Sequence, residues 1–259
     1  MEDKSSRSRW LIGRQAVERL ADATVAVFGL GGVGSIAAEA LCRSGVGRLI
    51  LVDHDRIALS NFNRQLFATD DQLGELKTDA ARRRLLSIRP DCRVETHPVF
   101  WPADPDNQMA ASILTPPVDY IIDAIDTVSA KISLIVHARS HGLPLISSMG
   151  TGYKLDPTRL ERTDLFATTT CPLARVMRRE LRRRGIDRLD VVYSTEEPVQ
   201  HPDRPEPDGS RQSPASMIFV PASAGLLLAS AVVRELSRTA ESGPPGSPSR
   251  SSGECGSAD

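Results

Sequence analysis

This sequence has no pair of cysteines at the spacing C-x-x-C, no strong net charge and no apolar leader at its start. Its cysteines, Cys42, Cys92, Cys171 and Cys255, are widely separated, which argues against a thiolate zinc site and a disulfide framework and fits a reducing cytoplasm. The net charge of −1 gives no overall attraction to nucleic acid, so any such contact must be a local patch. Residues 1–9 are charged and rich in serine, and we expect no signal peptide there.

Long apolar runs are also scarce. The longest, residues 217–233, has no charge and is near the lower limit for crossing a bilayer, but Pro221 and Gly225 interrupt it. The favoured interpretation is a buried helix from about Ser223 to Arg238, and membrane association stays open as a less favoured one. With 259 residues, 40% hydrophobic and 25% charged, the composition is that of an ordinary globular protein.

Strand-like and helix-like stretches alternate through the first 150 residues. Expected strands cover 25–28, 49–52, 94–99, 120–124 and 143–147, and expected helices cover 33–44, 70–89, 104–114 and 128–141. Such alternation is typical of a parallel sheet with helices on both faces. We expect an α/β fold, a Rossmann-like doubly wound, mostly parallel sheet with a smaller C-terminal extension.

The pattern changes after residue 150. Residues 151–165 suggest a hairpin around Asp156-Pro157, followed by a basic helix at 172–184, a strand at 191–194, a loop at 198–214 and a helix at 223–239. We expect four parts along the chain. They are an N-terminal arm at 1–20, a nucleotide-binding core at 21–150, a substrate or dimer region at 151–240 and a disordered tail at 241–259.

The most informative segment is a glycine turn between the first expected strand and helix. Gly29, Gly31 and Gly34 have the spacing G-x-G-x-x-G, and Gly32 adds a fourth glycine. Glycines at these places allow a tight turn, close approach of the backbone to a phosphate, and close packing of helix on strand. The N–H groups at the start of the following helix attract an anion. The segment therefore predicts a nucleotide site.

Later polar residues favour adenylation over hydride transfer. Asp53 ends the second expected strand, where an acidic side chain binds ribose hydroxyls. Asn61, Arg64 and Lys77 would converge near the phosphates, and the two cations would stabilise the charge that develops when a carboxylate attacks the α-phosphate of ATP. Asp126, at the end of the fourth expected strand, can hold Mg²⁺.

These motifs, in this order, resemble the ThiF/MoeB/HesA superfamily of adenylating enzymes. They are G-x-G-G-x-G at the turn, D-x-D at 53–55, S-N-x-x-R-Q at 60–65, a later lysine and D-x-x-D at 123–126, and the agreement covers about residues 7–150. The resemblance implies ATP and Mg²⁺ as cofactors. It implies nucleotide contacts from Gly29, Gly31, Gly32, Gly34, Asp53, Asn61, Arg64, Lys77, Asp126 and Thr127.

The resemblance also implies a catalytic group. It comprises Arg64, Lys77 and Asp126, which would hold the metal, and an arginine donated in trans by the other subunit of a homodimer. Arg7 has the matching position for this arginine, while Arg9 and Arg14 stay open as alternatives.

Within the superfamily, the chain is similar to the family of tRNA threonylcarbamoyladenosine dehydratases. The similar features include R-S-R-W-L-I-G at 7–13, Y-S-T-E at 193–196 and F-V-P at 219–221, and they extend the resemblance to about residue 238. The family reading implies that ATP adenylates the carboxylate of the modified adenosine next to the anticodon of a tRNA. The neighbouring carbamoyl group then closes a ring and expels AMP, an intramolecular step that needs no enzyme nucleophile.

A basic helix offers a surface for the tRNA. Arg175, Arg178, Arg179 and Arg182 have the spacing i, i+3, i+4, i+7, so they share one helical face to which a phosphate backbone would bind. A solvated helix without a partner is the alternative interpretation.

Other functions stay open. The main alternative is an adenylating enzyme for a ubiquitin-like sulfur-carrier protein, although such relatives commonly carry two C-x-x-C pairs that this chain lacks. A nicotinamide oxidoreductase is disfavoured by Asn61, Arg64 and Lys77. A non-catalytic nucleotide-sensing scaffold would leave the motifs without a purpose. The sequence identifies no sulfur-relay partner and no monovalent-ion site.

Overall fold

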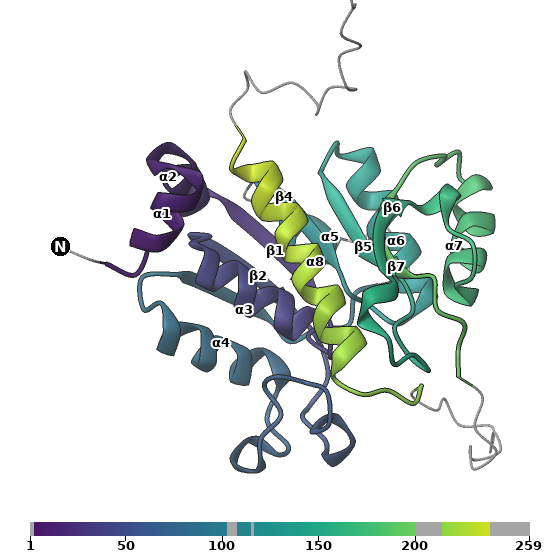
Figure 1. Cartoon of the computed structure of the whole chain (residues 1–259), viewed down its shortest axis with the longest axis horizontal. Helices are drawn as coiled ribbons and strands as arrows, with labels where there is room; N and C mark the ends of the chain where they lie inside the picture. The colour runs from purple at the N-terminus through teal and green to yellow at the C-terminus, as the bar shows by residue number, and fades with distance from the viewer. Residues whose placement is uncertain (1–2, 103–107, 115–116, 200–213, 239–259) are drawn as a thin grey trace, which may run out of the picture.

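The computed structural model describes residues 3–102, 108–114, 117–199 and 214–238, which fold around one sheet of seven strands (Figure 1). The strand order is β3-β2-β1-β4-β5-β7-β6, and β6 runs antiparallel to β7 while the other pairs are parallel. The expected mostly parallel, doubly wound sheet is confirmed. The strands are β1 (Thr24–Phe28), β2 (Arg48–Val52), β3 (Arg93–His97), β4 (Tyr120–Asp123), β5 (Leu145–Ser148), β6 (Leu160–Asp164) and β7 (Asp190–Ser194).

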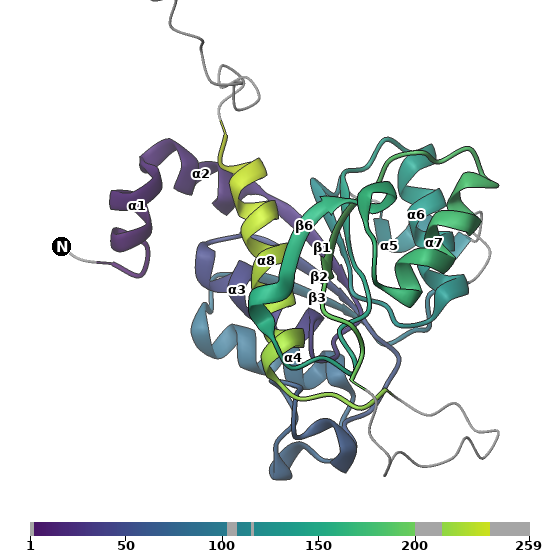
Figure 2. The ribbon, with the colours of Figure 1, turned by 45° about the vertical axis from the view of Figure 1, so that its right-hand side comes forward.

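Helices cover both faces of this sheet (Figures 1 and 2). Side chains alternate sides along a strand, so Val25 and Val27 of β1 pack with α3, α4 and α8, whereas Ala26 and Phe28 pack with α5 and α6. Burial on both faces explains why β1 is an uninterrupted apolar run after Thr24. The helices are α1 (Ser6–Ile12), α2 (Arg14–Asp22), α3 (Gly34–Ser44), α4 (Lys77–Ile88), α5 (Gln108–Leu114), α6 (Val128–Ser140), α7 (Pro172–Arg182) and α8 (Phe219–Leu236).

The strand order reverses at β1. From β1 the chain crosses to β2 and β3 on one side, and it returns to β4 and β5 on the other. Sheets of this kind bind ligands in the crevice beyond the carboxyl ends of the strands at such a reversal. The fold therefore directs attention to the residues that follow Phe28, Val52 and Asp123.

The expected hairpin at 151–165 is wrong. Only β6 forms there, and its partner is β7, about 30 residues further along the chain in the antiparallel register Leu160↔Ser194. The Asp156-Pro157 turn signal is real, but it starts a short 3-10 turn in which the Asp156 carboxylate accepts a hydrogen bond from the Thr158 N–H at 2.9 Å. A local turn signal was insufficient to identify the pairing partner.

Two expected helix starts also differ. α4 begins at Lys77 rather than at residue 70, because Gly74 has a left-handed φ of 84° that no helix continues through. α8 begins at Phe219 rather than at Ser223. Its Pro221 lies in the first helical turn, where backbone N–H groups make no hydrogen bond within the helix, so proline is tolerated there.

α8 is the element that raised the question of a membrane. Of the helices in the described residues, it is the one that is long enough and apolar enough to cross a bilayer. However, 44% of it is buried inside the fold. It packs closely on α3, since a Cβ added at Gly225 would lie 2.4 Å from the carbonyl oxygen of Val33. This packing fits the core-helix interpretation.

The sheet continues across the expected boundary at residue 150, because β6 and β7 extend the same seven strands. α1 and α2 occupy the part of the chain where the arm is expected, and α2 ends at Asp22, directly before β1. The expected tail at 241–259 and residues 200–213 of the expected loop lie outside the described residues.

Candidate functional site

The glycine turn follows β1 at the reversal of the sheet. A Cβ at Gly29 would lie 2.6 Å from the carbonyl oxygen of Ala124, and a Cβ at Gly34 would lie 1.7 Å from that of Gly29, so neither place accepts a side chain. Gly31 is open, with its nearest neighbour the Gln65 Nε2 at 3.9 Å. No side chain caps the N-terminus of α3. The turn can therefore bring bare backbone and the positive end of a helix to a phosphate.

Asp53 is tied to this turn. Its carboxylate is 8% exposed and accepts hydrogen bonds from the N–H of Leu30 at 2.6 Å and of Asp55 at 2.8 Å. Burial raises the pKa of Asp53, although the nearby Lys77 opposes this rise. The structure thus places Asp53 where the sequence predicts a contact to ribose, at the end of β2 and against the glycine turn.

Arg64 lies on the other side of the turn. Its Cγ is 3.4 Å from the position of a Cβ at Gly32, and its Nη1 donates to the Ser60 carbonyl at 2.6 Å and to the Asn63 Oδ1 at 3.1 Å. Within the described part of the chain Arg64 has no carboxylate partner. Burial lowers its pKa, as expected for a cation without a counter-charge. An anion at the turn would supply that counter-charge.

Asn61 organises the segment that carries Arg64. It ends a short 3-10 turn (Leu59–Asn61), is 9% exposed, and its Oδ1 accepts from the Ala58 N–H at 3.0 Å. Its backbone carbonyl accepts from the N–H of Arg64 at 3.1 Å. This fold of the S-N-x-x-R segment sets the backbone of Arg64, whose carbonyl oxygen lies 3.2 Å from the position of a Cβ at Gly32.

Lys77 begins α4 and is 6% exposed. Its Nζ lies 2.6 Å from the Oδ2 of Asp55, an interaction that the sequence analysis missed. The feature of the sequence that could have indicated this pair is the second acidic residue of the D-x-D motif, Asp55. Ligand atoms of Asp53, His54 and Asp55 lie within 4.8 Å of one another. However, the Asp53 carboxylate already accepts hydrogen bonds from two backbone amides, and the Asp55 carboxylate already pairs with Lys77. The geometry of the turn therefore accounts for this group without a metal ion.

The loop after β4 lies against the glycine turn, since Ala124 is the nearest neighbour of a Cβ at Gly29. Asp126 is exposed, and its Oδ1 accepts from the Thr127 hydroxyl at 3.2 Å. Asp123 at the start of the loop is fully buried and pairs with Lys131 of α6, which the sequence analysis also missed. A single lysine on the otherwise apolar face of the helix expected at 128–141 could have indicated it.

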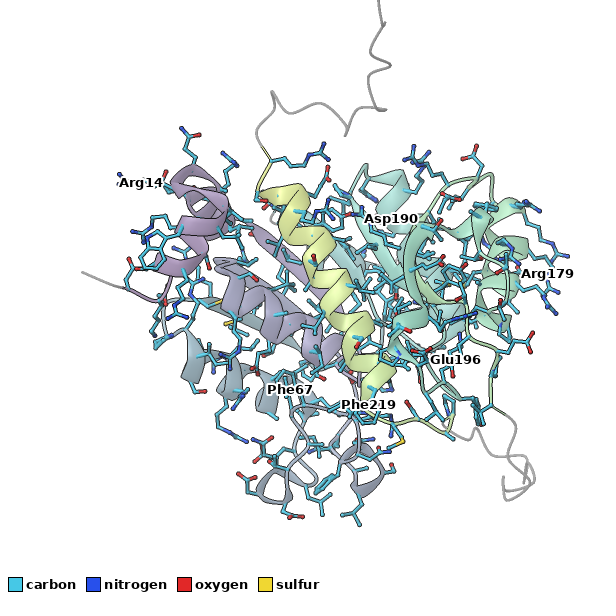
Figure 3. All side chains as sticks on the ribbon, viewed as in Figure 1. Arg14, Phe67, Arg179, Asp190, Glu196 and Phe219 are labelled. Atoms are coloured by element: carbon cyan, nitrogen blue, oxygen red, sulfur yellow. The ribbon has the colours of Figure 1, made fainter. Side chains whose placement is uncertain are left out.

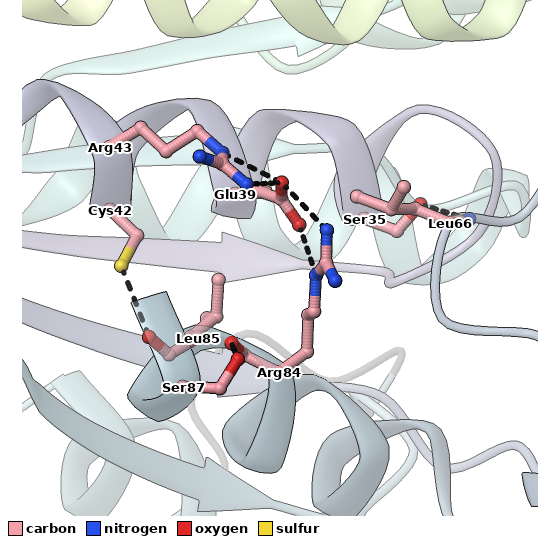
Figure 4. A network of polar contacts seen from close by, with 8 residues as sticks. All are labelled: Ser35, Glu39, Cys42, Arg43, Leu66, Arg84, Leu85 and Ser87. Carbon is pink, nitrogen blue, oxygen red and sulfur yellow. Dashed lines mark hydrogen bonds and ion pairs between the residues drawn. The ribbon is translucent and has the colours of Figure 1, made fainter. Parts of the chain in front are cut away.

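Helix α3 is held beside the turn by a polar network (Figure 4). Glu39 of α3 is 8% exposed and pairs with Arg84 of α4 at 2.9 Å and with Arg43 at 2.7 Å. Burial of Glu39 raises its pKa, but the two arginines outweigh burial and hold the pKa below its ordinary value. The Ser35 hydroxyl accepts from the N–H of Leu66 at 3.3 Å and so links α3 to the segment after Arg64.

The structure does not bring the N-terminal arginines to this crevice. α1 and α2 precede β1 and therefore lie at the amino edge of the sheet, and Figure 3 shows Arg14 at the upper left, well away from Phe219 near the bottom of the view. Arg9 pairs with Asp3 at 2.6 Å and Arg14 with Glu18 at 3.0 Å. Arg7 is exposed and has no such partner among the described residues.

The arginines of α7 lie apart from the glycine turn, on the side of the molecule where Figure 3 labels Arg179. Arg175, Arg179 and Arg182 are exposed, although Arg179 is 3.1 Å from Glu180 and Arg182 lies over the Phe166 ring at 5.1 Å. Arg178 is half-buried and donates to the Thr168 carbonyl at 2.7 Å, so it is the least available of the four.

The chain is similar to known proteins over most of its length. The model of the ThiF family matches residues 5–247. The tRNA threonylcarbamoyladenosine dehydratase of Bacillus subtilis is 40% identical over 246 residues, which are 91% of this chain and 95% of that protein. The Escherichia coli enzyme of the same name is 38% identical over 77% of this chain and 75% of its own length.

Solved structures extend the likeness to the fold. The crystal structure of the Escherichia coli dehydratase in complex with ATP is 34% identical, covers 90% of this chain and 93% of its own, and has a TM-score of 0.80. By contrast, the ubiquitin-like modifier-activating enzyme 5 of Drosophila pseudoobscura pseudoobscura is 41% identical, but over only 45% of this chain and 31% of its own length.

Proposed function

The chain belongs to the ThiF family, and we propose that it is an ATP-dependent dehydratase that closes a ring in the threonylcarbamoyladenosine next to the anticodon of tRNA. Relatives with this activity match it over most of both chains. The observation that carries the proposal is Arg64, a half-buried cation without a carboxylate partner among the described residues, set against a glycine turn that accepts no side chain at Gly29 or Gly34.

The reaction assigns a role to each polar residue of the crevice. A carboxylate oxygen of the substrate bonds to the α-phosphorus of ATP, and pyrophosphate leaves. Arg64 and Lys77 would stabilise the negative charge that develops on the phosphates. Asp53 would bind the ribose hydroxyls, and the Asn61 amide would face the phosphates beside Arg64. The carbamoyl group then attacks the acyl carbon, and AMP leaves with the carboxylate oxygen.

Asp126 would hold Mg²⁺. It is an exposed carboxylate in the loop after β4, its Oδ1 accepts from the neutral Thr127 hydroxyl, and oxygen ligands of this kind suit Mg²⁺. The bound ion would neutralise charge on the phosphates. Thr127 would help to orient the carboxylate.

We also propose that the enzyme acts as a homodimer in which Arg7 reaches the partner's crevice. Arg7, Trp10 and Leu11 have the spacing i, i+3, i+4 on α1, so they share one face, and Trp10 and Leu11 are 72% and 84% exposed. An exposed apolar face around a free cation is suited to docking on another copy. Because α1 lies at the amino edge of its own sheet, Arg7 could act only in trans.

Mixing two inactive variants tests this arrangement. Arg7→Ala and Lys77→Ala should each be inactive, and mixed dimers should regain activity, because one of their two sites combines an intact Lys77 with an intact Arg7. Arginine action in cis would leave the mixture inactive. Arg9→Ala and Arg14→Ala, mixed with Lys77→Ala in the same way, identify the arginine if Arg7→Ala proves active.

The main alternative is an adenylating enzyme for a ubiquitin-like sulfur carrier. The match to an enzyme that activates a ubiquitin-like modifier covers 45% of this chain, whereas the match to the Bacillus subtilis dehydratase covers 91% of it. The free thiols Cys42, Cys92 and Cys171 are buried and fit a reducing compartment, so we expect the reaction in the cytoplasm.

Mass analysis of nucleosides tests the function. Incubation of tRNA with the protein and ATP should convert threonylcarbamoyladenosine to a product lighter by one water. Arg64→Ala and Lys77→Ala should each abolish this loss. Arg83→Ala is the matched control, because Arg83 is an exposed arginine of α4 that pairs with Glu75 at 2.7 Å. Unchanged nucleosides with the intact protein, or full activity in both variants, would contradict the proposal.

A further inference from the structure

Three polar side chains lie in the centre of the fold, directly behind the loop that carries Asp126. The Nζ of Lys131 is 2.7 Å from the Oδ2 of Asp123 and 3.1 Å from the Ser147 hydroxyl, which itself donates to Asp123 at 2.7 Å. All three side chains are 0% exposed. Asp123 and Ser147 are register partners on β4 and β5, so the sheet holds them side by side.

Stability does not explain this pair. Removing two charges from water costs several kcal/mol for each ion, and apolar residues of similar volume often serve as well or better. The positions around Lys131 are apolar, with Ala130, Ile132 and Leu134 of α6 all buried. Burying a leucine or methionine at this position would cost less free energy than burying a lysine. Another property of the pair therefore needs an explanation.

The explanation lies in what Lys131 joins. Its Nζ binds Asp123, where the 124–127 loop begins, and Lys131 itself lies in the first turn of α6, which starts at Val128 directly after the loop ends. The other oxygen of Asp123 accepts from the N–H of Ile125 at 3.1 Å. The side chain of Lys131 thus ties the start of α6, on one side of the loop that carries Asp126, to Asp123 on the other side.

The same loop lies against the glycine turn. A Cβ at Gly29 would lie 2.6 Å from the Ala124 carbonyl oxygen, and a Cβ at Gly34 would lie 3.3 Å from the Ala124 Cβ. The N–H of Ala124 donates to the carbonyl of Phe28 at 2.8 Å. A shift of the loop away from the turn would therefore move Asp126 relative to a nucleotide held there.

We infer that Lys131 is a positioning residue, which through Asp123 holds the 124–127 loop against the glycine turn and so directs Asp126 at the bound nucleotide. The inference rests on the proposed function, because it needs Asp126 to contact the nucleotide or its metal. Lys131 itself touches no substrate. It acts through the conformation of a loop of four residues.

A neutral replacement of the pair tests the inference. Lys131→Met alone would leave Asp123 buried and unpaired, a change that could prevent folding. The double variant Asp123→Asn, Lys131→Met removes both charges together. Its affinity for ATP in the presence of Mg²⁺, measured by calorimetry, should fall about tenfold, an effect of the size by which neighbouring groups of one network commonly couple. A matched control is Asp190→Asn with Arg162→Met, a pair at 2.5 Å between β6 and β7 that should leave ATP affinity unchanged.

A double-mutant cycle with Asp126→Ala separates positioning from a structural role. Asp126→Ala should itself weaken ATP binding, and adding the neutral pair should then change affinity less than about twofold, because its effect passes through Asp126. Equal losses in both backgrounds would overturn the inference and leave the proposed function intact. The inference would also be overturned, with the proposed function intact, if the double variant Asp123→Asn, Lys131→Met bound ATP as tightly as the unchanged protein. If Asp126→Ala left ATP affinity unchanged, the assigned role of Asp126 would fail first, and the inference with it.

Discussion

Two glycines of the same turn should respond to alanine in opposite ways. At Gly34 the added Cβ would lie 1.7 Å from the Gly29 carbonyl oxygen, a backbone atom that cannot move without opening the turn. We expect Gly34→Ala to lower the free energy of unfolding by about 3 kcal/mol or more, at the upper end for overpacked sites. At Gly31 the nearest atom would be 3.9 Å away, and the backbone is not in the left-handed region. Gly31→Ala should therefore change stability by less than about 1 kcal/mol.

ATP binding should still suffer at Gly31. The new methyl group would stand where backbone N–H groups approach the phosphate, and losing one hydrogen bond to a charged group costs about 1.5–3 kcal/mol. We therefore expect ATP affinity to fall about ten- to a hundredfold. Chemical denaturation and calorimetry on the two variants measure both quantities. A Gly31→Ala variant that bound ATP as tightly as the natural protein would refute the claim that this turn holds the phosphates, and a fully stable Gly34→Ala variant would refute the geometry.

Three further predictions concern the supports of the site. Since Arg84 and Arg43 hold the pKa of Glu39 below its ordinary value, the stability that Glu39 contributes is present above about pH 4.5 and is lost as the pH falls through the lowered pKa. Glu39→Gln should lower the free energy of unfolding by about 1–2 kcal/mol at pH 7 and leave it unchanged near pH 2. Thermal unfolding measured across this pH range tests the prediction, and a difference between the two proteins that stays constant with pH would contradict it. Gly225→Ala should lower the melting temperature, because α8 would be pushed from α3, and an unchanged value would contradict the packing. Arg175→Ala should weaken tRNA binding and reduce its salt dependence by about one unit of log–log slope, and an unchanged slope would remove α7 from the interface.

The sequence predicted the strands of the core well, because β1, β2 and β4 are apolar on both faces and each precedes a recognisable change in pattern. It failed at 151–165. There a polar strand, Leu160–Asp164, finds its partner across a helix rather than across a turn, and no local signal encodes that distance. It also placed the start of α4 too early, because Gly74 gives little sign of its left-handed backbone until the structure is known.

Among the site residues, those within ordered motifs were predictable. Asp53 and Arg64 both lie against the glycine turn, at the carboxyl edge of the sheet that the alternation of strands and helices predicts, and their contact with a nucleotide stays a prediction. The partners were not predictable in the same way. Two ion pairs, Lys77 with Asp55 and Lys131 with Asp123, join residues eight or more positions apart. Only the packing of α4 and α6 on the sheet reveals them.

The most direct test of the central claim follows one oxygen atom. If ATP activates the carboxylate of threonylcarbamoyladenosine by adenylation, a tRNA labelled with ¹⁸O in that carboxylate should transfer one ¹⁸O to AMP during ring closure, while pyrophosphate stays unlabelled. Mass spectrometry of the released nucleotides reads the label. ADP with labelled phosphate, or AMP without the label, would show that the carboxylate is not joined to the α-phosphorus.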